Sequence, residues 1–98
     1  MEITKTQEGT KLTVAVSGRL DTNTAPELDA AIKESIEGMT EVVLDIADLE
    51  YISSAGLRVL LAAEKAMAKA RGMKLINVNE TIMEIFEVTG FSDILTIA

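Results

Sequence analysis

Residues 42–72, VVLDIADLEYISSAGLRVLLAAEKAMAKARG, decide the fold of this chain. They open with the apolar run 42–46, which is short and rich in β-branched residues, as is typical of a strand covered on both faces. Ser53 and Ser54 then begin a helical pattern, which we expect to continue to the end of the stretch. With a loop expected over residues 47–52, the stretch predicts the strand–loop–helix unit of a parallel sheet.

Further strand patterns lie on both sides of this unit. Apolar and polar residues alternate over residues 11–17, behind a turn at residues 8–10, so we expect a hairpin whose second strand ends at Gly18. Residues 73–78 predict another strand, and residues 94–97 predict a last short one. Because the strands after the hairpin alternate with helices, we expect a mixed sheet with parallel crossovers.

Helix signals fill the segments between these strands. A helix is expected within residues 20–38, with Pro26 in its first turn. Another is expected from Asn79 or Thr81 to about Gly90. For the first helix, the cap candidates are Asp21, Thr22, Asn23 and Thr24, and the expected buried residues are Ala30, Ala31, Ile32 and Ile36. For the helix that follows the two serines, the expected buried residues are Val59, Leu60, Ala63, Ala66, Met67 and Ala70.

The size and composition suit one hydrophobic core. The chain has 98 residues, of which 48% are apolar, and a formal net charge of −7. We therefore expect a single domain over residues 1–98. The order of elements predicts an α/β fold with a mixed sheet of about four or five strands and about three or four helices.

The residue types that are missing exclude most compact catalytic sites. The sequence contains neither histidine nor cysteine. Catalytic triads that use these residues, the usual zinc ligands and disulfide bonds are therefore excluded. We expect no enzymatic activity, no cofactor and no metal site. A nucleophilic Ser54 would have only a lysine or a carboxylate as its base.

Charge and hydropathy also limit the classes of partner that this chain can bind. The 16 acidic residues outnumber the 9 basic ones, and aromatic residues make up only 3%, so the chain lacks the basic clusters and stacking surfaces that bind nucleic acid. The longest apolar run, residues 59–63, is too short to span a bilayer, and the N-terminus does not resemble a signal peptide. We expect a cytoplasmic protein that binds neither nucleic acid nor membrane.

The two serines form the strongest candidate site. A helix start leaves backbone N–H groups unpaired and carries partial positive charge, so it accepts a hydroxyl, a carboxylate or a phosphate. One serine can serve simply as the N-cap. At about 100° per residue, Ser54 projects near Arg58 and near two leucines, Leu57 and Leu61. We expect these leucines to form a partly open edge for a partner, small enough that the free protein is a monomer.

A second polar loop, residues 18–26, also follows a strand. Because loops at the carboxyl ends of parallel strands share one edge of a sheet, we expect this loop to lie beside the serines. There, Asp21 either caps the next helix or orients a reactive hydroxyl. Gly56 allows close approach either of the helix to the sheet, which is the favoured interpretation, or of a partner to the backbone. Asp45 and Asp48 are expected to be structural rather than a metal-binding or acid–base pair.

These loops and their flanks resemble the STAS family, which is named for sulfate transporters and anti-sigma factor antagonists, and within it the stand-alone bacterial antagonists. The resemblance runs nearly from end to end. Four motifs carry it: Gly18-Arg19-Leu20-Asp21 leading into Thr24-Ala25 and Leu28; Val43-Leu44-Asp45-Ile46 with Leu49; Tyr51-Ile52-Ser53-Ser54-Ala55-Gly56-Leu57 with Leu60-Leu61; and Phe86-Glu87-Val88-Thr89-Gly90-Phe91.

The resemblance implies the STAS fold and regulation by partner switching. In this scheme the unphosphorylated form binds an anti-sigma factor serine/threonine kinase and frees a sigma factor, phosphorylation ends the binding, and a phosphatase resets the switch. The phosphorylated serine of the family lies two positions before the glycine, which here is Ser54. The better-known antagonists have aspartate where this chain has Ser53, so Ser53 is the alternative site. The implied partner-binding residues are Asp21, Thr22, Asn23, Thr24, Ser53, Ser54, Ala55, Gly56, Leu57, Arg58 and Leu61.

Two other functions stay open at this point. A STAS module can act as an adaptor subunit that docks to a transporter, a lipid-transfer system or a stress-signalling complex without regulating a sigma factor. Nucleotide binding has been suspected for the family, although this chain has no phosphate-binding glycine pattern.

Overall fold

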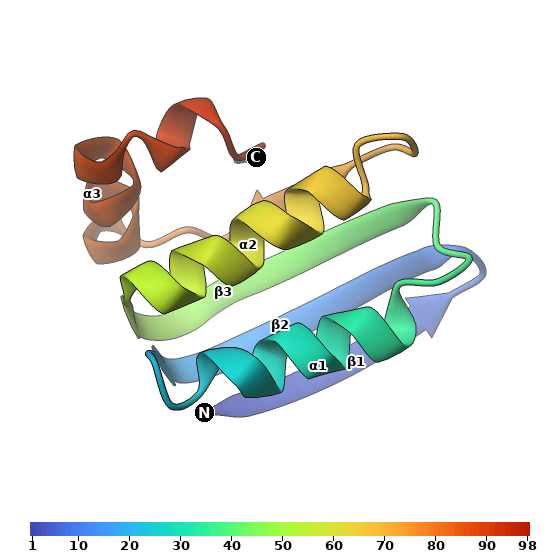
Figure 1. Cartoon of the computed structure of the whole chain (residues 1–98), viewed down its shortest axis with the longest axis horizontal. Helices are drawn as coiled ribbons and strands as arrows, with labels where there is room; N and C mark the ends of the chain where they lie inside the picture. The colour runs from blue at the N-terminus through green and yellow to red at the C-terminus, as the bar shows by residue number, and fades with distance from the viewer.

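A four-stranded sheet with strand order β1-β2-β3-β4 organises the chain (Figure 1). The computed structural model describes all residues from Met1 to Ala98. The elements in chain order are β1 (Glu2–Glu8), β2 (Lys11–Leu20), α1 (Ala25–Ser35), β3 (Glu41–Ile52), α2 (Ser54–Ala66), β4 (Met73–Ile76), α3 (Glu80–Thr89) and a 3₁₀ helix (Phe91–Asp93). β1 pairs antiparallel with β2, whereas β2, β3 and β4 are parallel, so the expected α/β fold with a mixed sheet is confirmed.

The core lies mainly between one face of the sheet and the helices α1 and α2, and α3 adds Ile82 and Phe86 to it. α1 and α2 run side by side across that face, while α3 and the 3₁₀ helix lie at one end of the molecule (Figure 1). Alternating residues of β2 point toward the helices because the side-chain period of a strand is two. The core includes Leu12, Val14 and Val16 from β2, Leu44, Ile46 and Leu49 from β3, Leu28 and Ile32 from α1, and Leu60 and Ala63 from α2.

Both central strands are longer than the sequence pattern predicts. β2 does not end at Gly18, and the loop expected over residues 47–52 is the second half of β3. The register between β2 and β3 shifts twice, between Ala15 and Ser17 and again between Gly18 and Arg19. Along the second half of β3 the buried residues Ile46, Leu49 and Ile52 are three positions apart rather than two. The sequence therefore lacks the alternation of apolar and polar residues that predicts a strand.

The buried face of α1 differs from the expected one. Of the four residues expected to be buried, only Ile32 is; Ala30 is exposed, and Ala31 and Ile36 are half-buried. Leu28 is completely buried, one helical turn before Ile32, because α1 turns that row of side chains toward the sheet.

α2 ends at Ala66 and does not continue to Gly72. The backbone N–H of Arg71 donates to the carbonyl of Thr40 at 2.9 Å, which ties the segment after α2 to the loop before β3. Ala66 and Ala70 are exposed and Val59 is half-buried, so these three expected core positions are wrong. The remaining residues that were expected to be buried in this region, Leu60, Ala63 and Met67, are buried.

The C-terminal region follows the prediction in order but not in extent. β4 stops at Ile76, and Asn77 adopts a positive φ of 58°. α3 begins after the cap residue Asn79, one of the two expected starts, and ends at Gly90 in the left-handed conformation. The strand expected over residues 94–97 is reduced to one parallel bridge between Leu75 and Ile97. None of the helices has the length and apolarity that a membrane span requires.

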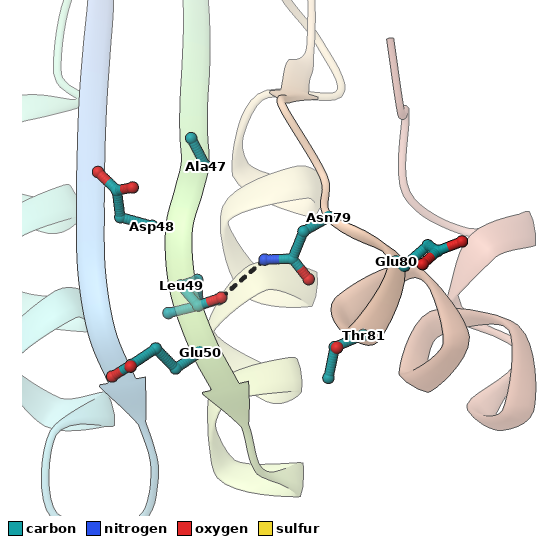
Figure 2. Close-up of a pocket in the computed structure, with 7 residues that line it drawn as sticks. All are labelled: Ala47, Asp48, Leu49, Glu50, Asn79, Glu80 and Thr81. Carbon is teal, nitrogen blue, oxygen red and sulfur yellow. Dashed lines mark hydrogen bonds between the residues drawn. The ribbon is translucent and has the colours of Figure 1, made fainter.

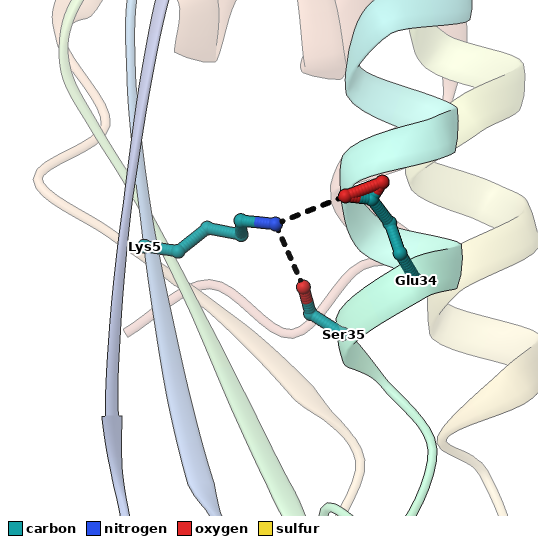
Figure 3. Close-up of polar contacts among 3 residues, drawn as sticks. All are labelled: Lys5, Glu34 and Ser35. Carbon is teal, nitrogen blue, oxygen red and sulfur yellow. Dashed lines mark hydrogen bonds and ion pairs between the residues drawn. The ribbon is translucent and has the colours of Figure 1, made fainter.

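The edge strand β1 is held against α1 by a polar contact. Lys5 Nζ donates to Ser35 Oγ at 2.9 Å and lies 3.4 Å from Glu34 Oε1 (Figure 3). Both partners lie in the last turn of α1, so the lysine side chain connects β1 to α1. Because the pair is exposed, its contribution to stability is small, about 0–1 kcal/mol.

Candidate partner-docking site

The two polar loops meet at one edge of the sheet, as expected. Leu20 at the end of β2 pairs with Ile52 at the end of β3. Directly beyond this pair, the backbone N–H of Ser53 donates to the carbonyl of Leu20 at 2.8 Å. The loop that starts at Asp21 and the helix that starts at Ser54 therefore leave the sheet from adjacent positions.

The structure gives the two serines different environments. Ser53 is half-buried with extended backbone, and its Oγ accepts a hydrogen bond from Gly56 N–H at 3.4 Å. It is therefore the N-cap of α2. Ser54 is exposed in the first turn of α2, and its hydroxyl group takes no part in the side-chain hydrogen bonds around the cap. A free hydroxyl at a helix N-terminus can accept a phosphate without loss of the cap.

Asp21 organises its own loop. One carboxylate oxygen, Oδ1, accepts hydrogen bonds from the backbone N–H groups of Asn23 at 2.9 Å and Thr24 at 3.1 Å. The Thr24 N–H bond is the main reason that the pKa of Asp21 lies below its ordinary value, and the nearby Arg19 guanidinium acts in the same direction. Thr24 is the N-cap residue of α1 but makes no side-chain capping bond to it. Asp21 therefore shapes the loop before α1.

Thr24 closes the same loop from the other side. Its Oγ1 accepts from the backbone N–H of Asp21 at 2.8 Å and donates to the carbonyl of Arg19 at 2.7 Å. Thr22 and Asn23 are exposed at the tip. The loop thus presents two polar residues to solvent on a backbone held by its neighbours.

Arg19 and Tyr51 form a pair at this edge that is not among the expected site residues. They are register partners in β2 and β3, and the Arg19 guanidinium carbon lies 4.4 Å from the centre of the Tyr51 ring. Arg19 is exposed, and Tyr51 retains 36% of its surface. In the sequence, Arg19 and Tyr51 are marked only by their position directly before a buried residue, Leu20 or Ile52. That they lie side by side follows from the shifted register between β2 and β3, which the sequence does not reveal.

The expectation of a partly open edge at Leu57 is wrong. Leu57 is only 5% exposed, and the preceding residue, Gly56, is also buried. A Cβ atom on Gly56 would lie 2.7 Å from Leu20 Cγ and 2.9 Å from Ile52 Cγ1, which supports the packing interpretation of this glycine. The first turn of α2 packs directly on the ends of β2 and β3. Gly56 and Leu57 therefore face the core.

The surface left to a partner on α2 is therefore more polar than expected. Ser54 and Arg58, four residues apart and so on one side of the helix, are exposed, whereas Ala55 and Leu61 are half-buried. Together with the tip of the Asp21 loop, these residues make one polar edge. Such an edge suits a regulated contact with another protein better than a permanent apolar interface.

Asp45 has the structural role that was expected. Its Oδ1 accepts from the backbone N–H of Ala47 and from Asn77 Nδ2, each at 3.1 Å. These bonds connect the middle of β3 to the turn after β4. Asp48 lies further along β3, exposed, and has no ion-pair partner.

Comparison with known proteins connects the whole chain to a family. The family model described as "Mlab, STAS domain" matches residues 3–96. A putative anti-sigma factor antagonist, BtrV of Bordetella bronchiseptica, is 33% identical, with 100% of this chain and 86% of the relative aligned.

Solved structures show the same fold. The crystal structure of an anti-sigma factor antagonist from Mycobacterium paratuberculosis superposes with a TM-score of 0.88 at 24% identity, covering 98% of this chain and 83% of the other. The anti-sigma factor antagonist SpoIIAA in its unphosphorylated form superposes with a TM-score of 0.83 at 18% identity, covering 99% and 88%. The predicted fold is thereby confirmed.

Proposed function

The chain belongs to the STAS domain family, and from this premise we propose that it is an anti-sigma factor antagonist that works by partner switching. In its unphosphorylated form it binds an anti-sigma factor serine/threonine kinase and frees a sigma factor. Phosphorylation of Ser54 ends the binding, and a phosphatase restores it. The observation that carries the proposal is the exposed Ser54 hydroxyl in the first turn of α2, at the polar edge shared by the Asp21 loop.

Ser54 is a better phosphate acceptor than Ser53 for a structural reason. The Ser53 hydroxyl is half-buried and caps α2, so its modification would remove a cap that contributes about 1 kcal/mol. The Ser54 hydroxyl faces solvent, where a kinase can reach it without disturbing the helix.

A phosphate on Ser54 changes the docking surface more than the fold. It adds about −1.5 to −2 charges, which takes the net charge from −7 to about −9. The helix N-terminus stabilises an anion locally, and Arg58 lies one turn further on the same side. A partner surface packed on this edge, by contrast, would have to desolvate the phosphate and meet its charge.

The docking surface on this proposal consists of two exposed groups with a buried support. Thr22 and Asn23 at the tip of the Asp21 loop and Ser54 with Arg58 on α2 face the partner. Gly56 and Leu57 support the edge from inside the core. On this proposal the exposed polar residues contact the partner. Asp21, Thr24, Ser53 and the buried apolar residues hold those polar residues in position.

The proposal is tested by capture of partners from the native cytosol. Tagged wild type, Ser54→Asp and Ser54→Ala are used as baits, and mass spectrometry identifies both the partners and the phosphorylated residues. Ser92→Asp, which adds the same charge in the 3₁₀ helix, is the matched control. Circular dichroism establishes that each bait is folded.

The expected result is a serine kinase recovered by wild type and Ser92→Asp but not by Ser54→Asp, with phosphate on Ser54. Phosphate on Ser53 alone would keep the switch and move it to the other serine. Unchanged kinase binding by a folded Ser54→Asp would contradict the mechanism.

The adaptor function has one observation in its favour, since the description of the matching family model is "Mlab, STAS domain" and does not mention antagonists. If wild type and Ser54→Asp both recover the subunits of a transporter, a lipid-transfer system or a stress-signalling complex, the adaptor function replaces the antagonist. The serines would then act only at the start of α2.

A further inference from the structure

A groove lies between the second half of β3 and the start of α3, away from the serine switch. β4 pairs with β3 only from Val42 to Asp45, so the edge of β3 beyond Asp45 has no strand beside it. α3 starts next to this free edge, and a cavity of about 670 Å³ remains between them, lined by residues 47–50 and 79–81. We name it the β3–α3 groove.

The floor of the groove shows that the free edge of β3 can accept a hydrogen-bond donor. Asn79 Nδ2 donates to the carbonyl of Leu49 at 2.8 Å, in the place where a neighbouring strand would donate (Figure 2). The same side chain caps α3, since its Oδ1 accepts from Ile82 N–H at 2.9 Å. Asn79 therefore links the two walls of the groove and already occupies the Leu49 carbonyl, so a bound segment would displace Asn79 there or pair with β3 beside it.

The charges around the groove are of one sign. Asp48 and Glu50 project from β3 on its β2 side, and Glu80 lies on the α3 side, so carboxylates stand on both flanks (Figure 2). No lysine or arginine lines the groove, and neither of the two ion pairs of the structure involves these carboxylates. The start of α3 alone would attract an anion, but three full negative charges outweigh a partial positive one.

We propose that the β3–α3 groove binds an extended, basic segment of a partner protein. An extended backbone suits the free edge of β3, because strand addition supplies main-chain hydrogen bonds and lets alternate side chains point to one face. Lysine or arginine at those alternate positions would reach the carboxylates on the two flanks. The four β3 residues that line the groove match a segment of about 13 Å.

This site is independent of the serine switch, which lies at the start of α2, directly after the end of β3. Glu50 precedes Ser54 by four residues, so a partner that occupies the groove reaches toward the polar edge. A segment held there would position the partner's remaining surface without touching Ser54.

The proposal is tested by NMR titration of the isotopically labelled full chain with a synthetic peptide of alternating lysine and valine, at low ionic strength. Amide shifts are expected to concentrate in residues 47–50 and 79–81, and affinity should fall as salt screens the charges. A peptide with glutamate in place of lysine is expected to produce no shifts.

Two triple variants separate the groove from general acidity. Asp48→Asn/Glu50→Gln/Glu80→Gln removes the flanking charges and should weaken binding about tenfold. Glu27→Gln/Glu37→Gln/Glu87→Gln removes three exposed charges elsewhere and should weaken it less than about threefold. The proposal would be overturned if both variants weakened binding equally, or if the amide shifts spread over the whole acidic surface. A rise in sedimentation coefficient that shows self-association in place of peptide binding would also overturn it.

Discussion

Gly56 of α2 packs so closely on Leu20 of β2 that a Cβ atom in its place would lie 2.7 Å from Leu20 Cγ. This contact fixes the height of α2 above the sheet at the point where the serines begin. The same approach buries Leu57 and leaves Ser54 and Arg58 outside. The geometry of the docking edge therefore depends on a residue that cannot itself contact a partner through a side chain.

Gly56→Ala is expected to destabilise the protein. Alanine is favoured over glycine in a helix by about 1 kcal/mol, but overpacking against Leu20 and Ile52 costs about 1–3 kcal/mol. Urea unfolding followed by circular dichroism measures the difference. In the Leu20→Ala background the contacts with Leu20 are removed and only the 2.9 Å contact with Ile52 Cγ1 remains, so Gly56→Ala should cost less than it does in wild type. An undiminished cost would refute the close-packing explanation.

The two serines should differ in their effect on stability. Ser53→Ala removes the N-cap of α2 and should lower the free energy of unfolding by about 1 kcal/mol, whereas Ser54→Ala should stay within about 0.5 kcal/mol of wild type. Thermal or urea unfolding of the two variants checks this. The reverse order would mean that Ser54, not Ser53, caps the helix.

Asp21 should make stability depend on pH in a defined direction. Its pKa in the folded protein lies below the ordinary value of 3.8, so the carboxylate stabilises the fold above that value. This contribution is lost as the pH falls through the lowered pKa. The difference in unfolding free energy between wild type and Asp21→Asn should therefore be constant near neutral pH and shrink in acid. A difference that does not change with pH would show that the charge makes no contribution.

Asn79 should contribute to stability through two separable bonds. Asn79→Asp keeps an oxygen that can cap α3 but loses the donor to the Leu49 carbonyl, whereas Asn79→Ala loses both. We expect the alanine variant to lose about 1 kcal/mol more than the aspartate variant. Equal losses would show that the cap contributes nothing, and chemical denaturation distinguishes the two results.

Much of the architecture was predictable because it is encoded locally. Alternation in residues 11–17 and the Gly9 turn identified the hairpin, and the apolar run before the two serines identified a central strand. Gly90 marks the end of α3, and Asn79, one of the two starts that the sequence offers, marks its beginning. The two loops could be placed together because topology alone brings the ends of parallel strands to one edge.

The errors arose where distant residues decide the structure. The second half of β3 was expected to be a loop, because register shifts against β2 disturb its alternation. Helical geometry alone predicts an open edge at Leu57, whereas the close packing of α2 on Leu20 and Ile52 buries that side chain.

The sequence by itself determined the α/β class, the order of the elements, the acidic surface and the pair of serines at a helix start, because each depends on residues near one another in the chain. Only the tertiary structure decided which serine caps α2 and which face of α2 stays open. The same holds for the stacking of Arg19 on Tyr51 and for the groove that forms because β3 extends beyond β4. These features depend on strand register and on the distance between packed backbones, which are set by contacts across the whole core.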